Sequence, residues 1–213
     1  FTEEQMDKYL VTTVGKINNI DKIVEGLFNK GHSHFLEMSG GDINATELVA
    51  SIINQRDNVV EGLQYAQEII EGSMSIMLLT PKGIYVARDK MGRTPIAIGK
   101  KDNAYCAAFE SFAYLNLGYQ DVRELGPGEI AVITPEYVTT LVQPGKDMKI
   151  CTFLWVYYGY PSSCYEGVNT EAARYRNGES LVEFDKDLLR NIDSICGNKP
   201  RIIVLNRMRS IRR

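Results

Sequence analysis

The chain has 213 residues, with 24 Lys and Arg against 27 Asp and Glu and 44% hydrophobic residues, which is typical of one globular domain or of one domain with part of another. A formal net charge of −3 gives no overall positive field that would attract nucleic acid or an anionic membrane surface. The apolar runs are far shorter than the roughly 18 residues of a membrane-spanning helix, and the acidic start does not resemble a signal peptide. We therefore expect a cytoplasmic protein.

The charge is divided unevenly along the chain. Residues 186–213 hold eight Lys and Arg and two Asp and Glu, a net charge of +6. The other 185 residues therefore have a net charge of −9, since the whole chain has −3. A split of this size is typical of two structural contexts in one chain. Because residue 1 is Phe rather than Met, we expect a piece of a longer protein.

The cysteines are widely spaced, and no histidine lies close to any of them. They are Cys106, Cys151, Cys164 and Cys196. The pattern argues against a structural zinc site and against a secreted disulfide scaffold. Free and mostly buried thiols in a reducing compartment are expected from the spacing alone.

The first 70 residues alternate strand and helix signals. In chain order, the expected elements are a strand at 9–14, a helix at 20–29, a strand at 34–38, a helix that begins after Asn44 and a helix at about 58–70. Asn19 and Asn44 are suitable N-caps, and Glu47 completes a capping box with Asn44.

From Ser73 the hydrophobic period changes from helical spacing to alternation. The expected strands are 73–80, 84–90, 94–100, 104–109, 129–134 and 138–142. Short strands this close together, preceded by helices, predict an α+β fold in which antiparallel sheets pack with helices. An aromatic segment at 149–160, a helix at 170–189 and a strand at 201–205 follow a boundary near 144–150.

Four blocks of this sequence resemble one enzyme family in order and spacing. They are Gly72–Ser75, Ala87–Pro95, Ala108–Ser111 and Leu125–Ile130. The first three are similar to the Gly-Ser-Phe-Ser, Ala-Arg-Asp-x-x-Gly-x-x-Pro and Ala-Ser-Glu-Ser blocks of the amidophosphoribosyltransferases, also called glutamine phosphoribosylpyrophosphate amidotransferases. Other glutamine amidotransferases of the N-terminal-nucleophile type share these blocks, so they indicate the superfamily.

The narrower assignment depends on residues 151–167. Cys151–Tyr158, Pro161–Ser163 and Gly167 resemble the linker that leads into the phosphoribosyltransferase domain of this family. This linker argues against the alternative of an asparagine- or hexosamine-forming synthase with the same amidotransferase domain. The resemblance covers roughly residues 9–185. It implies a four-layer αββα sandwich in residues 1–148, followed by a linker and part of an α/β phosphoribosyltransferase domain in residues 149–213.

The family implies a reaction at two sites. An N-terminal Cys thiol attacks the side-chain amide of glutamine, and the ammonia released displaces pyrophosphate from phosphoribosylpyrophosphate, which gives phosphoribosylamine for purine biosynthesis. Glutamine and phosphoribosylpyrophosphate are then the expected partners, in a homo-oligomer. An intact family member can hold Mg and a [4Fe–4S] cluster, but no cofactor is expected in this chain.

The catalytic positions of this chain depart from the family pattern. Residue 1 is Phe, which has no nucleophilic atom, so no catalytic residue is assigned. The oxyanion motif His-Asn-Gly aligns with Thr13, Val14 and Gly15, which leaves only Gly15 as a remnant of the oxyanion hole. The Asp that holds the substrate amine in the family aligns with Ala45, and the nearby Asp42 is more simply explained as a solvated turn residue.

Two further segments limit which sites can be assigned from the resemblance. After the apolar residues 202–205 the family's acidic pair and glycine are absent, so no phosphoribosylpyrophosphate site is assigned. Cys151 matches one of four Cys ligands of the cluster in the iron–sulfur subgroup, and is a candidate for a single metal ligand. The chain is therefore expected to be inactive as a glutaminase. Two alternatives stay open: a cut form of a working enzyme, and a decayed, non-enzymatic domain with a regulatory or scaffolding role.

Overall fold

A five-stranded antiparallel sheet forms the centre of the molecule. The computed structural model describes residues 8–29, 38–39 and 42–185. In spatial order the strands are β1 (Leu10–Ile17), β4 (Gly72–Thr80), β5 (Gly83–Ala87), β9 (Ile130–Ile133) and β10 (Val138–Val142). β1 pairs with β4 along its whole length, from Leu10 opposite Leu79 to Ile17 opposite Gly72.

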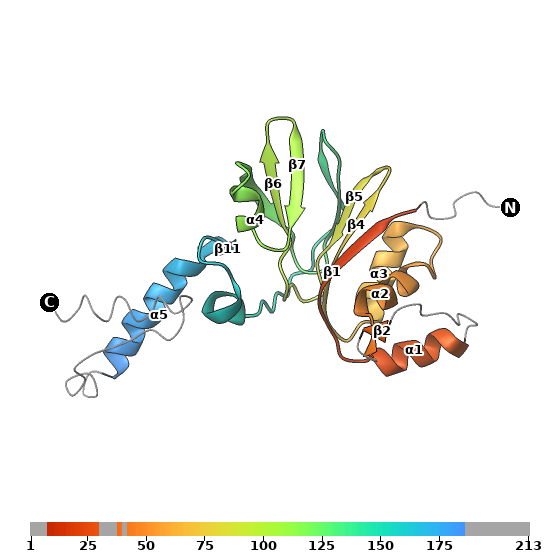
Figure 1. Ribbon diagram of the computed structural model, residues 1–213, viewed down its shortest axis with the longest axis horizontal. Helices are drawn as coiled ribbons and strands as arrows, with labels where there is room; N and C mark the ends of the chain where they lie inside the picture. Colours follow the sequence, from red (N-terminus) through yellow and green to blue (C-terminus); the bar gives the residue numbers. More distant parts are fainter. Residues whose placement is uncertain (1–7, 30–37, 40–41, 186–213) are drawn as a thin grey trace.

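Three helices cover one face of this sheet (Figure 1). They are α1 (Ile20–Asn29), α2 (Ala45–Ile53) and α3 (Val59–Ile69). Asn44 and Asn58 cap α2 and α3 by accepting hydrogen bonds from the first free backbone N–H groups of each helix. Leu48 and Ile52 of α2 are fully buried against Ile76 and Leu78 of β4, in the larger of two hydrophobic cores.

A second sheet lies on the other face of the five-stranded sheet (Figure 1). Its strands are β7 (Ala104–Ala108), β6 (Ala97–Lys101) and β8 (Gln120–Glu124), in that order. Because side chains alternate along a strand, Met77 of β4 points away from the helices and packs with Ile96 and Ile98 in the second core. The short helix α4 (Phe112–Leu115) lies beyond this second sheet (Figure 1). We call the two sheets with α1–α4 the body.

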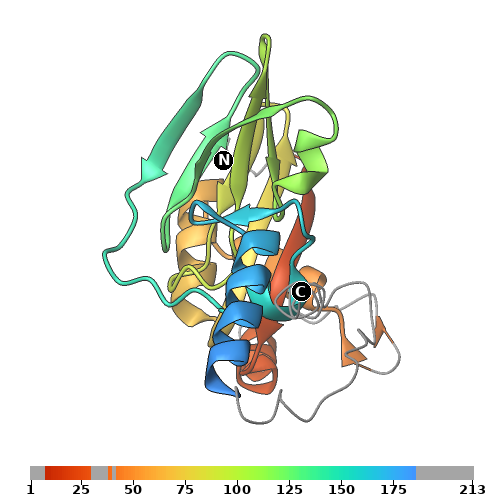
Figure 2. The ribbon, with the colours of Figure 1, turned by 90° about the vertical axis from the view of Figure 1, so that its left-hand side faces the viewer.

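After β10 the chain runs through a linker segment (residues 149–169) into a last helix. The linker segment contains a π-helical turn, η1 (Leu154–Tyr158), and a small hairpin of β11 (Cys164–Tyr165) and β12 (Val168–Asn169). The helix is α5 (Thr170–Phe184), which extends away from the sheets; Figure 2 looks onto this end of the molecule. Another small hairpin, β2 (Met38–Ser39) and β3 (Asp42–Ile43), precedes α2.

The predicted helices at the start of the chain and the antiparallel sheets are confirmed. The structure differs at 84–90, where β5 ends at Ala87 because the Asp89 carboxylate accepts hydrogen bonds from the backbone N–H groups of Met91 and Thr94 and closes a turn. The Asn19 side chain, expected to cap α1, instead connects to the end of α3: it donates to the Ile69 carbonyl and accepts from the Glu71 N–H. The expected strand at 201–205 and most of that at 34–38 lie outside the described residues.

Candidate functional site

β1 and the first turn of α2 meet where the resemblance predicts the glutaminase site. The hydroxyl oxygens of Thr13 and Thr46 lie 2.7 Å apart, so each segment that aligns with a catalytic motif contributes one side chain to this contact. Val14 lies on the opposite face of β1, next to Ser75 of β4. The structure therefore brings the two aligned segments together, with an aliphatic side chain at position 14.

Gly15 lies where β1 and β4 come very close. It is exposed, pairs with Met74, and has φ of +153°. A Cβ at this position would lie 1.8 Å from the carbonyl oxygen of Ser73, so only glycine fits. The close approach of the two strands explains by itself why position 15 is a glycine. A part of Gly15 in an oxyanion hole stays a prediction.

The N-terminus of α2 is occupied by its own cap. The Asn44 side chain accepts hydrogen bonds from the N–H groups of Thr46 (2.9 Å) and Glu47 (3.3 Å). Ala45, which aligns with the amine-binding Asp, is the half-buried first residue of the helix and offers only a methyl group. Asp42 belongs to β3, where its backbone pairs with Ser39.

The family-like blocks of β4 and the β5–β6 loop form a scaffold of hydrogen bonds. Ser75 is fully buried and donates to the Thr94 carbonyl at 2.8 Å, while the hydroxyls of Ser73 and Thr94 lie 2.8 Å apart. Asp89, also buried, accepts from two N–H groups of its own loop. These polar side chains bond to backbone and side-chain groups of the loop, so they fix its shape.

Arg88 connects this loop to the linker segment. Its side chain is fully buried and donates to the carbonyl oxygens of Leu125 and Gly92, and to the Glu166 carboxylate at 2.7 Å. A buried guanidinium costs little when several acceptors and a carboxylate surround it. The sequence places Arg88 in a family-like block, but the spacing gives no sign of its partner 78 residues away.

The block at Glu110 and Ser111 also binds the linker segment. One oxygen of the Glu110 carboxylate accepts from the Tyr160 N–H and from the Ser163 hydroxyl, both at 3.2 Å. The buried Ser111 hydroxyl accepts from the Cys164 N–H at 3.0 Å. Together with Arg88, these residues seat the linker segment on the body.

Two glutamates have shifted pKa values of opposite sign. Burial and the neighbouring Glu166 carboxylate raise the pKa of Glu124, on β8, to about 7. Burial also acts to raise the pKa of Glu129, but hydrogen bonds from Arg123, the Gly126 N–H and Thr140 outweigh it and lower the pKa below its ordinary value. A perturbed carboxyl is typical of functional sites, although structural ion pairs shift pKa values as well.

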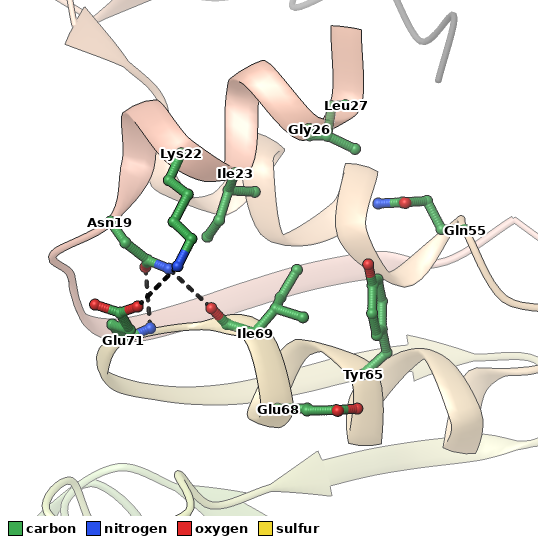
Figure 3. A pocket seen from close by; sticks show the side chains of 10 residues that line it. All are labelled: Asn19, Lys22, Ile23, Gly26, Leu27, Gln55, Tyr65, Glu68, Ile69 and Glu71. Carbon is green, nitrogen blue, oxygen red and sulfur yellow. Dashed lines mark hydrogen bonds and ion pairs between the residues drawn. The ribbon is translucent and has the colours of Figure 1, made fainter. Parts of the chain in front are cut away.

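A surface pocket lies on the helical side of the body, between α1 and α3 (Figure 3). It has a volume of about 330 Å³ and is lined by side chains that include Ile23, Tyr65 and Glu68. The Lys22 ammonium and the Glu71 carboxylate pair at 3.5 Å at one end, and both are exposed, so this pair contributes little to stability. None of the residues predicted for the glutaminase site lines this pocket.

Cys151 is exposed at the start of the linker segment, and its N–H donates to the Arg93 carbonyl at 3.5 Å. Within residues 8–29, 38–39 and 42–185, no three His, Cys, Asp or Glu side chains lie close enough together to hold a metal ion. A single thiolate does not fit a four-iron cluster, in which each iron needs a ligand. Cys106 and Cys164 are free and half-buried, and Cys196 lies outside the described residues.

No helix in the described part of the chain is both long enough and apolar enough to cross a membrane.

Comparisons with known proteins match the chain to one kind of enzyme. No family model matches it. The amidophosphoribosyltransferase of Methanothermobacter thermautotrophicus is 27% identical over 182 residues, which cover 85% of this chain and 38% of that protein. The amidophosphoribosyltransferase of Bacillus subtilis is 26% identical over 172 residues, covering 79% of this chain and 35% of the relative. This chain thus spans a little over a third of the length of these relatives.

Solved structures agree on the fold. The glutamine phosphoribosylpyrophosphate amidotransferase of B. subtilis, complexed with ADP and GMP, matches with a TM-score of 0.74 and 24% identity, over 86% of this chain and 40% of that one. A structure described as the allosteric regulatory enzyme of purine biosynthesis matches with the same TM-score and identity. The resemblance found in the sequence is confirmed: over about four-fifths of its length, this chain is homologous to the amidophosphoribosyltransferases.

Proposed function

We propose that this chain is the amidotransferase-type part of an amidophosphoribosyltransferase, and that its glutaminase site does not hydrolyse glutamine. We further propose that the two sheets and their helices form the four-layer αββα sandwich of N-terminal-nucleophile amidotransferases, with a domain boundary at 148/149. The layer order of helices, sheet, sheet and α4 supports this architecture.

The hydrogen bond between Thr13 and Thr46 is the observation that carries the proposal. It joins the strand that contains Val14 to the start of the helix that contains Ala45, which supports a common site for the two aligned segments. Val14 has no group that donates to an oxyanion, and Ala45 has none that binds an ammonium. Loss of one oxyanion donor costs about 2.7–4 kcal/mol of transition-state stabilisation in studied enzymes. Val14 lies within β1 and Ala45 is the first residue of α2, so both changes lie in regular secondary-structure elements.

The proposed reaction of the whole protein uses ammonia directly. The nitrogen lone pair attacks the anomeric carbon of phosphoribosylpyrophosphate, the bond to pyrophosphate breaks, and a proton leaves the nitrogen to give phosphoribosylamine. The names of the relatives support this substrate class. Cytoplasmic location, a homo-oligomeric state, Mg and an iron–sulfur cluster stay predictions from the resemblance.

Release of pyrophosphate by the intact protein tests the proposal. With phosphoribosylpyrophosphate present, we expect ammonium to support release and glutamine to support none. Hydrolysis of glutamine by the protein would contradict the argument from Val14 and Ala45. As a gain-of-function test, Val14→Asn with Ala45→Asp is expected to create glutamine binding measurable by calorimetry. Thr12→Asn, at an exposed position two residues before Val14 on the same face of β1, is the matched control and is expected to bind none.

A non-enzymatic regulatory or scaffolding role is the second candidate. The observation that favours it is a group of exposed aromatic side chains at η1: Phe153, directly before the turn, and Tyr157 and Tyr158 within it are each more than half exposed. Large exposed apolar side chains gathered on one element are typical of contact surfaces. Absence of pyrophosphate release with either nitrogen source would favour this role.

A further inference from the structure

The tip of the β11–β12 hairpin is held by a cluster of three charged side chains. Glu166 and Gly167 form the turn of the hairpin, with φ values of +47° and +73°. The Glu166 carboxylate accepts from Arg88 at 2.7 Å, and the Glu166 N–H donates to Oε1 of Glu124 at 2.9 Å. One residue of the linker segment is thus fastened both to the β5–β6 loop and to β8.

The cluster is unbalanced in charge. Arg88 supplies one positive charge, fully buried, against the two carboxylates of Glu124 and Glu166. Oε2 of Glu124 is buried and accepts no hydrogen bond. Tyr114 of α4 also interacts electrostatically with Glu124, and its hydroxyl is already bonded to Asp121. Glu124 is half-buried and the Glu166 side chain is one-third exposed, so an ionised Glu124 leaves an excess negative charge that solvent screens only in part.

A proton on Glu124 removes this excess. The cluster then consists of one guanidinium and one carboxylate at 2.7 Å, and the buried oxygen of Glu124 becomes a potential donor. Oε1 can still accept the Glu166 N–H, so protonation leaves the hairpin contact in place. The docked hairpin is consequently the form of the molecule that favours a protonated Glu124.

We propose that Arg88, Glu124 and Glu166 form a proton-dependent latch that fastens the β11–β12 hairpin, and with it the start of α5, to the body. Opening the hairpin exposes Glu124 to water, so docking takes up a proton and opening releases it. The inference concerns contacts within this chain and does not depend on the proposed enzymatic function.

The sign of the effect follows from linkage. The pKa of Glu124 is about 7 in the docked form and returns toward its ordinary value of 4.5 when the hairpin opens. Between these two values the docking equilibrium constant falls with rising pH, by up to about tenfold per pH unit. Above the docked value both forms are ionised, and the constant stays at its minimum.

Hydrogen exchange of the Glu166 amide tests the latch. After correction for intrinsic exchange, its protection is expected to fall about tenfold or more from pH 5.5 to pH 7.5. In Glu124→Gln the protection is expected to be the same at both pH values. Trp155, the only tryptophan of the chain, donates to the Val168 carbonyl at 3.0 Å, so its emission reports the hairpin independently. A wild-type protection that does not change with pH would overturn the proposal.

Two further variants test whether Glu124 or another group causes the pH dependence. His32→Gln with His34→Gln removes the side chains that ordinarily titrate near pH 6.5, and the pH slope is expected to persist. Glu166→Gln removes the facing carboxylate, so the slope is expected to move to lower pH; this variant serves if Glu124→Gln does not fold by near-UV circular dichroism. A slope abolished by the histidine changes, or unmoved in Glu166→Gln, would show that another group is responsible.

Discussion

The hydroxyl groups of Thr13 and Thr46, 33 residues apart in the chain, lie 2.7 Å from one another and join the edge strand β1 to the first turn of α2. Replacing either residue by Val leaves the other hydroxyl half-buried and without this partner. We expect each single change to lower the free energy of unfolding by about 1 kcal/mol, and the double change to cost less than the sum. Urea unfolding of the four proteins gives the coupling energy. Thr12→Val, at an exposed position of β1, is the control and is expected to change stability by less than about 0.5 kcal/mol.

The close approach of β1 and β4 predicts an asymmetry between two glycines. Gly15→Ala would place a Cβ 1.8 Å from the Ser73 carbonyl oxygen, so the strands must separate, and we expect a loss of about 2–3 kcal/mol in the free energy of unfolding. Gly26→Ala adds a methyl group in α1 with nothing within 4 Å, and is expected to be neutral or to stabilise by up to about 1 kcal/mol. Equal effects of the two changes would contradict the geometry.

The lowered pKa of Glu129 predicts that the free energy of unfolding decreases in acid. Its pKa is lowered below 4.5 in the folded chain, so the stabilisation is complete above the unfolded value and is lost as pH falls through the folded one. We expect Glu129→Gln to lower the free energy of unfolding by about 2 kcal/mol at pH 7, because Arg123 then lacks its carboxylate partner. The difference in free energy of unfolding between the variant and the wild type should shrink as the pH falls below 4.5. Glu136→Gln, on an exposed turn, is the matched control; a difference that stays constant with pH would refute the assignment.

Arg174 of α5 holds the π-helical turn of the linker segment. Its buried guanidinium donates to the carbonyl oxygens of Trp155 (2.8 Å), Tyr157 (3.3 Å) and Gly159 (2.8 Å). Arg174→Leu removes these donors. We expect it to lower the free energy of unfolding by about 3 kcal/mol and to shift the Trp155 fluorescence emission to the red. Arg176→Ala, two residues along on the exposed side of α5, is expected to change neither.

Local signals of the sequence predicted the helical part of the fold well. Asn44 caps α2 as expected, and α3 begins close to the expected residue 58, because a cap and the hydrophobic period that follows lie within a few residues of each other. β8 was not expected, since the segment from Gln120 to Glu124 is polar and mostly exposed, and shows no alternation of apolar residues. Its position as an edge strand beside β6 is a tertiary effect that no local pattern encodes.

The candidate site was predictable only through resemblance. The motif alignments indicated Gly15 and Ala45, but no spacing in the sequence brings β1 and α2 together at Thr13 and Thr46. The partners of Arg88 and Glu110 lie about 50 to 80 residues away, so pairing them requires knowledge of the sheets between them. Cys151 is where the sequence predicts a metal ligand, and its part in a cluster stays a prediction.

The seating of the linker segment has a practical consequence for dividing this protein. A cut after residue 148 would follow the boundary proposed from the sequence. It would also remove the contacts of the Glu110 carboxylate with Tyr160 and Ser163, and leave the Arg88 guanidinium bonded to two carbonyl oxygens but without its counter-ion Glu166. A shorter version that ends after α5, at Phe184, retains every one of these contacts. A fragment that keeps these contacts therefore has to contain the linker segment together with the body.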